Sequence, residues 1–241
     1  EASNKARPPI QREAEFAHMG WTTINGRLAY LFHGGAVGVQ GVSVELEGEL
    51  TGYCLPSTVR DAQRAIHASL EVLNVAPAPV VIPTYAFAFL APLCHFLHRA
   101  NYPPAFTLYL AGGTGTRKTT LAALVLAHFG AEWNNKRLPA NFNDTSNALM
   151  QKAFLCKDAP LLVDDFRPSA TQKERRNLDE KAQRLATGWG DYAARSRLRA
   201  DSSMDATKPP RGIGMITGED APNITESGTA RFYVVQVGRR D

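Results

Sequence analysis

The chain has 241 residues, a formal net charge of +4 at pH 7 and a hydrophobic content of 44%. This length allows one large domain or one domain with an appended unit, and the hydrophobic content is enough for a packed core. No run of about eighteen apolar residues stands out, so the sequence predicts no membrane-spanning helix and no membrane partner. Cys54, Cys94 and Cys156 have no metal-binding or disulfide spacing, which is typical of free thiols in a reducing compartment, here the cytoplasm.

The first hundred residues are expected to form a tail and then a small β-rich and helical region. Residues 1–20 are polar and irregular, and the chain does not begin with methionine, which indicates a boundary inside a longer protein. Between Trp21 and Leu55, short apolar runs alternate with glycines, as in small hairpins. Residues 57–75 and 84–99 show helical spacing of apolar residues, with several prolines between them. The predicted division is therefore 1–20, 21–100 and 101–241.

The remaining residues alternate between strands and helices, which indicates an α/β domain. An apolar strand is expected at 106–111, followed by a glycine-rich loop and a helix at 118–129. The later elements are a helix at 146–157, a strand at 159–166, a charged helix at 169–187 and strands at 212–217 and 231–237. Strand–loop–helix repeats of this kind predict a central, mostly parallel sheet flanked by helices, with right-handed crossovers.

The glycine-rich loop matches the phosphate-binding pattern G-x-x-x-x-G-K-[ST] at all but one position. Its backbone N–H groups can turn toward phosphate oxygens, the lysine can reach the β- and γ-phosphates, and the threonine hydroxyl can bind Mg²⁺. The sequence therefore predicts an ATP site in a P-loop NTPase. The residues expected to bind the nucleotide are Gly112, Gly113, Thr114, Gly115, Thr116, Arg117, Lys118, Thr119 and Thr120.

Arg117 is the departure from this pattern, because it stands where the second glycine is expected. Glycine lets the backbone approach phosphates without a Cβ, so an arginine there needs a compatible backbone and an outward-pointing side chain. The sequence leaves three outcomes open: normal ATP binding, weakened hydrolysis, or an additional cation near the phosphates.

A second motif, LLVDDF, is an apolar strand that ends in Asp164 and Asp165. In P-loop enzymes the first carboxylate holds Mg²⁺, directly or through water, and the second orients or deprotonates the attacking water. Thr217 ends a later strand and is expected to contact the γ-phosphate, with Glu219 close by; an ordinary turn residue is the alternative for Thr217. The predicted metal ligands are Thr119 and Asp164, and the predicted catalytic residues are Lys118, Asp164, Asp165, Thr217 and Arg231.

Basic residues are concentrated in one segment. Residues 167–211 contain 11 Lys/Arg and six Asp/Glu, whereas the rest of the chain contains 16 and 17. This clustering is expected of a nucleic-acid contact, and a solvated helix face is the alternative. We favour DNA binding by the arginine cluster and stabilisation of the transferred phosphate by Arg231, and the sequence leaves the reverse assignment open. The predicted DNA ligands are Arg195, Arg197, Arg199 and Lys208.

The order of these motifs resembles the ATPase module of domain-of-unknown-function family 927, which occurs in phages, plasmids and integrated mobile elements. The resemblance extends from Trp21 to Val237 and is carried by GW, GRLAYLFHGGAVG, VSVEL, GYCLP, AGGTGTRKT, LLVDDF, KPPRG and ITGED. It implies a motor ATPase of the AAA+, RecA-like and superfamily-three helicase kind. Such a motor would be a homo-oligomeric ring of about six subunits that uses ATP and Mg²⁺ on DNA, above all single-stranded DNA. It also implies a primase or replication partner, and a pore-lining loop at 191–211.

Two other functions are weighed against a DNA motor. One is a nucleotide-gated oligomeric binding module in which Arg117 slows hydrolysis and ATP holds subunits together. The other is a small-molecule kinase or GTPase, which the sequence disfavours because Asn135-Lys136 does not continue into the guanine-binding N-K-x-D pattern.

Overall fold

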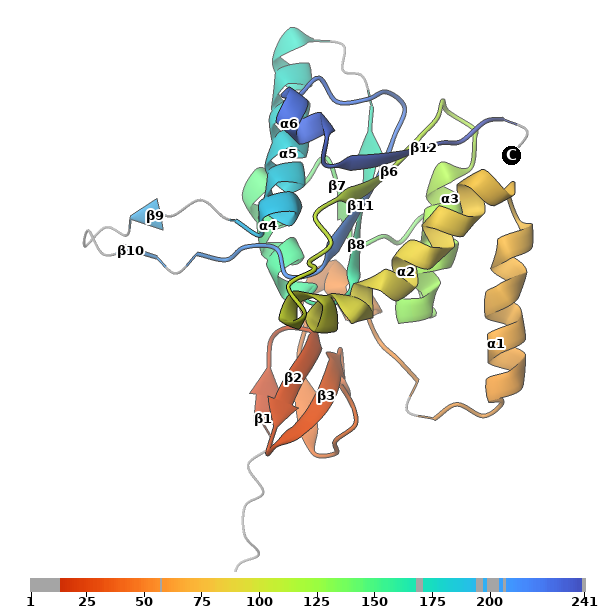
Figure 1. Ribbon diagram of the computed structural model, residues 1–241, viewed down its shortest axis with the longest axis vertical. Helices are drawn as coiled ribbons and strands as arrows, with labels where there is room; N and C mark the ends of the chain where they lie inside the picture. The colour runs from red at the N-terminus through yellow and green to blue at the C-terminus, as the bar shows by residue number, and fades with distance from the viewer. Residues whose placement is uncertain are drawn as a thin grey trace, which may run out of the picture.

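The computed structural model describes residues 14–56, 58–167, 171–193, 197–198, 204–205 and 207–239. A β-rich unit from the amino-terminal part of the chain packs beneath a larger α/β body (Figure 1). The short pair β9 (Arg197–Leu198) and β10 (Met204–Asp205) is antiparallel and projects from the side of the body.

The centre of the body is a five-stranded sheet with helices on both faces. In spatial order its strands are β12 (Phe232–Gln236), β6 (Thr107–Ala111), β11 (Ile213–Gly218), β8 (Pro160–Phe166) and β7 (Ala140–Asn141). Every neighbouring pair in this sheet is parallel. Strands β6 and β11 are buried along their whole length, because a parallel sheet is covered on both faces. The expected parallel sheet flanked by helices is confirmed.

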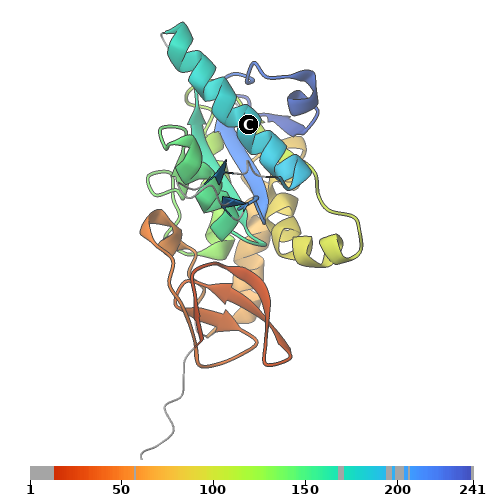
Figure 2. The same cartoon turned by 90° about the vertical axis from the view of Figure 1, so that its left-hand side faces the viewer.

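Two groups of helices cover the sheet (Figure 2). On one face lie α4 (Ser146–Leu155), α5 (Gln172–Asp191) and α6 (Glu226–Thr229), and on the other lie α2 (Ala78–Arg99) and α3 (Lys118–Leu126). Thr145, Thr171 and Thr225 each cap a helix by accepting a backbone N–H three residues ahead. Local capping of this kind fixes where these helices begin.

Helix α2 differs most from its prediction. It begins at Ala78 rather than at 84 and continues through Pro83 and Pro92. A proline in the first turn is tolerated because its missing N–H would have no helical partner there, and Pro79 occupies such a place. The longer helix has 22 residues and a mean hydropathy of 1.8, so by length and composition alone it could span a membrane, an apolar stretch that was not recognised from the sequence. In this fold it packs against α3 and the sheet.

The β-rich unit consists of two small sheets. Strands β2 (Gly20–Ile24), β3 (Arg27–Phe32) and β4 (Gly35–Val37) form an antiparallel meander, and β1 (Ala14–Phe16) pairs in parallel with β5 (Val42–Val44). The 3₁₀ turn η1 (Gly48–Gly52) follows, and α1 (Ala62–Glu71) with η2 (Val72–Asn74) leads to α2. Strand β1 and the first residue of β2 thus lie within residues 1–20, the range expected to be a tail or linker.

The β-rich unit covers the amino end of the parallel sheet. The Trp21 backbone N–H donates to Asp158 Oδ2 at 3.0 Å, and the Tyr30 hydroxyl donates to the Asp158 carbonyl at 2.9 Å. The Tyr53 hydroxyl donates to the carbonyl of Pro160, the first residue of β8, at 2.7 Å. Residues of the unit and of the body also share one hydrophobic core. The amino-terminal part of the chain and the part after residue 100 therefore pack against each other without a gap between separate cores.

Candidate functional site

Three chain segments meet at the carboxyl edge of the sheet, opposite the β-rich unit. The glycine-rich loop follows β6, and its Gly112 N–H donates to the Gly218 carbonyl at 3.0 Å. The Glu219 N–H donates to the Phe166 carbonyl at 2.9 Å, which joins the ends of β11 and β8. In open α/β sheets, ligands bind outside the carboxyl ends of the strands. The predicted site residues of these segments therefore lie at a position suited to a ligand.

The loop has a backbone that glycine makes possible. A Cβ at Gly112 would collide with the Val237 carbonyl and lie 2.9 Å from Thr116 Oγ1. Gly115 has a φ of +86°, in the region that side chains disfavour. The Thr116 hydroxyl donates to the Gly113 carbonyl at 2.9 Å and closes the turn. The loop is thus a tight turn that leads directly into α3.

Arg117 adopts the conformation that a glycine would take at its position. Its φ and ψ are 61° and 17°, in the left-handed region, and it forms the N-cap of α3 with its side chain exposed. This backbone costs an arginine roughly 1 kcal/mol relative to glycine. The backbone conformation that the substitution requires is therefore present, and the side chain is exposed rather than packed inside the loop.

Lys118 is the first residue of α3, and its side chain is buried, with only 9% of the residue exposed. Within the described part of the chain, its ammonium forms neither a hydrogen bond nor an ion pair. A largely buried lysine leaves an unpaired positive charge at this place, and the N-terminus of a helix adds further positive potential. The position is therefore suited to an anion such as phosphate.

Asp164 joins the loop to the sheet. Its Oδ1 accepts a hydrogen bond from Thr119 Oγ1 at 2.9 Å and another from the Thr217 hydroxyl. Thr217 is fully buried, and its Oγ1 also accepts from the Asp165 N–H at 3.3 Å. The structure thus brings together four predicted residues from three separate segments.

The oxygen atoms of Thr119 and Asp164 fit Mg²⁺, which prefers hard oxygen ligands. No group of three or more His, Cys, Asp or Glu side chains among the described residues could hold a metal by itself. A site with two protein ligands suits Mg²⁺, because this ion keeps several waters and commonly shares its coordination with substrate phosphates.

An irregularity in strand pairing places the two carboxylates. Val163 pairs with Ile216 and Phe166 with Gly218, so Asp164 and Asp165 together face a single residue of β11. Asp165 has a φ of 73°. A bulge of this type breaks the alternation of side chains along a strand and re-aims them.

Arg167 is the residue of this site that sequence reasoning missed. Its Nη2 forms an ion pair with Asp165 Oδ2. The hydrogen bond to Asp165 and the charge of that carboxylate, with smaller contributions from Glu219 and Asp164, raise the pKa of Arg167 above its ordinary value. Glu219 in turn accepts a hydrogen bond from the Thr114 hydroxyl of the loop. The sequence did contain a signal for this ion pair, because Arg167 follows the acidic pair at the strand end by two positions.

Arg231 lies apart from these residues. Its carbonyl accepts from the N–H of Thr107, the first residue of β6, so it belongs to the amino edge of the sheet. Its guanidinium forms an ion pair with Asp191 at 2.6 Å. Because β6 and β12 are parallel, Arg231 lies at the far end of the strands from the candidate site of its own chain. A role in a neighbouring subunit stays a prediction.

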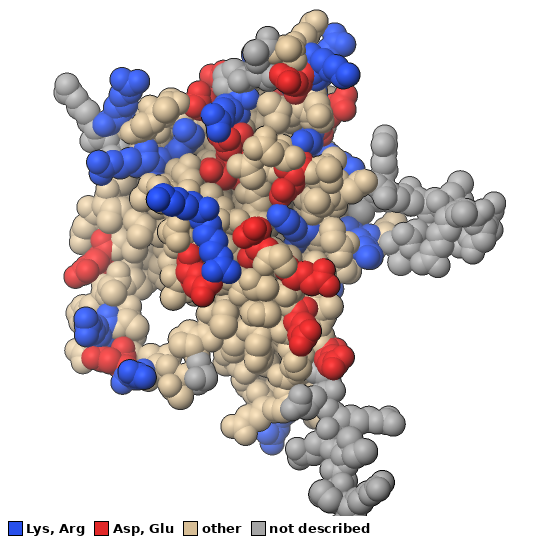
Figure 3. Space-filling model, turned by 180° about the vertical axis from the view of Figure 1, so that it is seen from behind, with Lys and Arg blue, Asp and Glu red and all other residues tan. Residues whose placement is uncertain are grey.

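The side chains of most predicted DNA ligands do not belong to the described part of the chain. Arg195 and Arg199 lie outside the described residues, and only the backbone of Arg197 is described, in β9. The Lys208 ammonium lies 3.4 Å from Gln151 Oε1 and 5.9 Å from the Phe154 ring centre, both on α4. Figure 3 shows Lys and Arg interspersed with Asp and Glu on one face of the molecule.

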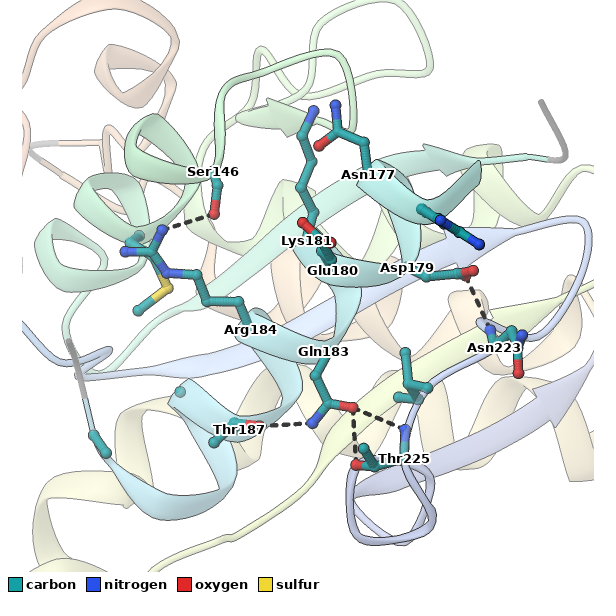
Figure 4. Close-up of a pocket in the computed structure, with 15 residues that line it drawn as sticks. Ser146, Asn177, Asp179, Glu180, Lys181, Gln183, Arg184, Thr187, Asn223 and Thr225 are labelled. Carbon is teal, nitrogen blue, oxygen red and sulfur yellow. Dashed lines mark hydrogen bonds between the residues drawn. The ribbon is translucent and has the colours of Figure 1, made fainter. Parts of the chain in front are cut away.

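A groove with a volume of about 1160 Å³ lies elsewhere, along α5 (Figure 4). Its polar side chains form hydrogen bonds within the groove: Gln183 Oε1 accepts from the backbone N–H of Thr225 at 3.0 Å, and Arg184 donates to Ser146 Oγ at 2.9 Å. None of the residues predicted to bind ATP, metal or DNA lines this groove. The candidate site is therefore the carboxyl edge of the sheet and not the groove.

The fold is similar to that of a solved helicase. A structure described as "SCCmec type IV Cch - active helicase" aligns with a TM-score of 0.58 at 13% sequence identity, over 92% of this chain and 40% of that chain. A small-molecule complex of JCV helicase aligns less well, with a TM-score of 0.32 at 16% identity, over 71% of this chain and 52% of that chain. No protein-family model and no curated protein matches the chain. The chain thus shares a fold with the first helicase and spans less than half of its length.

Proposed function

We propose that the chain is the P-loop ATPase module of a helicase-like DNA motor. The observation that carries this proposal is the largely buried Lys118 side chain, whose ammonium has no partner in the described chain and which directly precedes Thr119 of the Thr119–Asp164–Thr217 cluster. An unpaired cation at a helix N-terminus, next to oxygen ligands for a metal, is the arrangement that a nucleoside triphosphate with Mg²⁺ requires.

Each residue of the site has a role in this proposal. Lys118 and the N–H groups of the loop bind the phosphates, and Thr119 with Asp164 holds Mg²⁺. The ion, when bound, neutralises charge on the phosphate oxygens. Asp165 orients the attacking water, which requires it to leave Arg167, and Thr217 fixes Asp164 in place.

The DNA-motor part of the proposal rests on the fold shared with a helicase and on the basic residues at 191–211. The resemblance of the sequence motifs to those of domain-of-unknown-function family 927 favours a cytoplasmic motor of a phage, plasmid or integrated mobile element. They also favour a ring of about six copies that works with a primase or other replication protein.

ATP hydrolysis by the purified chain with Mg²⁺, with and without single-stranded DNA, tests the proposal. We expect hydrolysis that DNA stimulates and that Lys118→Ala abolishes. Lys136→Ala, which removes an exposed lysine far from the loop, is the matched control and should behave as the wild type. Combined Arg195, Arg197 and Arg199→Ala should weaken DNA binding without changing hydrolysis in its absence. No DNA stimulation together with unchanged DNA affinity of the triple variant would rule out the motor.

A second function is favoured by one contact, the ion pair between Arg167 and Asp165. If this pair persists with nucleotide bound, the carboxylate is not free to orient water, and the chain is a nucleotide-gated oligomeric module with slow hydrolysis. Assembly should then follow ATP binding, and Asp165→Asn should leave it unchanged. Measurable turnover that depends on Asp165 would exclude this second function.

A further inference from the structure

Arg117 is unusual among the residues with a left-handed backbone. Six non-glycine residues of the described chain have a positive φ, and four of them are Asn or Asp. Asn and Asp tolerate this conformation because their short side chains can hydrogen-bond locally. The two exceptions are Tyr192, whose hydroxyl bonds to the Pro104 carbonyl, and Arg117.

No contact in the described part of the chain explains an arginine at position 117. The side chain is exposed, and its guanidinium forms no hydrogen bond or ion pair there. Glycine would adopt the same backbone without strain. Residues held in sparsely populated backbone conformations cluster at functional sites, where the strain accompanies the function.

The charges of the surrounding site indicate what this guanidinium can bind. Arg167, the other arginine at this edge of the sheet, is already paired with Asp165. Arg117 comes directly before Lys118, at the N-terminus of α3, where an anion is favoured. A guanidinium binds phosphate through two parallel hydrogen bonds, which gives both energy and orientation.

We propose that Arg117 is a ligand of the nucleotide phosphate chain, a cation that this chain supplies to its own site. The proposal rests on the proposed function, because it assumes that the loop binds a nucleoside triphosphate. In this arrangement Arg117 stands where the pattern has its second glycine, and its side chain binds the same phosphate chain as Lys118.

The test combines stability with nucleotide affinity, because the two should change in opposite directions. Arg117→Gly relieves the backbone and removes the charge, so we expect unfolding at a higher urea concentration and roughly 10-fold or greater loss of affinity for a fluorescent ATP analogue with Mg²⁺. Arg117→Lys keeps both the charge and the strain, and its affinity should be closer to that of the wild type. Asn25→Gly relaxes another positive φ, in the turn between β2 and β3, and should leave affinity unchanged.

The outcomes separate this proposal from the proposed function. If the wild type binds the analogue, Lys118→Ala abolishes binding and Arg117→Gly binds as the wild type does, the role of Arg117 is overturned and the proposed function stands. Loss of both stability and affinity in Arg117→Gly would assign Arg117 a structural role and overturn the proposal. A change in oligomer mass with unchanged affinity would also overturn it, because the ligand would then be a neighbouring subunit. A wild type that binds no analogue would overturn the proposed function itself.

Discussion

Thr119 Oγ1 donates a 2.9 Å hydrogen bond to Asp164 Oδ1 and so joins two residues that are 45 positions apart in the sequence. The bond connects the first turn of α3 to the end of β8. It places a hydroxyl and a carboxylate side by side, beside a buried lysine. The first prediction concerns this pair.

Asp164→Asn should reduce Mg²⁺-dependent ATP hydrolysis by about 100-fold or more, because the amide keeps an acceptor for Thr119 but loses the charge that binds the metal. The measurement is kcat over a Mg²⁺ titration, with thermal unfolding as a check on the fold. Asp179→Asn, on α5 and outside the site, is the control. Wild-type kcat in Asp164→Asn would contradict the assignment of Asp164 as a metal ligand.

Arg167→Ala should increase ATP hydrolysis in the absence of DNA by up to about fivefold. The arginine side chain is 63% exposed, and exposed ion pairs contribute at most about 1 kcal/mol, so releasing Asp165 has a limited effect on rate and little effect on stability. Arg137→Ala, which removes the exposed pair with Glu132, is a control expected to leave the rate unchanged. A large decrease in kcat on loss of Arg167 would show instead that Arg167 itself acts on the phosphates.

Asp158→Ala should destabilise the fold by roughly 2–4 kcal/mol, because it removes a buried carboxylate that accepts from the Trp21 N–H and forms an ion pair with Lys157. The measurement is the free energy of unfolding in urea. Asp61→Ala removes the exposed N-cap of α1 and should cost about 1 kcal/mol. Equal effects of the two substitutions would mean that Asp158 does not hold the β-rich unit to the sheet.

The native chain should expose one of its three cysteines to a thiol reagent at about pH 8. Burial raises the pKa of Cys94 and Cys156 to about 12, so neither forms the reactive thiolate at that pH, whereas Cys54 is exposed. Counting thiols with a chromogenic disulfide before and after denaturation should give one and then three. Rapid labelling of a second thiol in the native state would show that the core opens around α2 or α4.

The sequence determined the local parts of the structure with good accuracy. The apolar runs that became β6, β8, β11 and β12 and the helix at Lys118 were found because periodicity and the glycine-rich loop are properties of neighbouring residues. The same reasoning failed at α2, where prolines suggested a break that packing against the sheet overrides. It also missed β7, because a two-residue strand has no periodicity to detect.

Only the tertiary structure decided which residues form the site. The position of β11 between β6 and β8 places Thr217 against Asp164, and the parallel pairing of β12 with β6 removes Arg231 to the opposite edge. The bulge that aims Asp164 and Asp165 depends on pairing between strands about 50 residues apart. The sequence by itself determined that a phosphate-binding loop and an acidic strand end are present. Strand order and register decided which residues lie beside that loop and that strand end. Both depend on contacts between distant segments, because the sheet must be buried on its two faces.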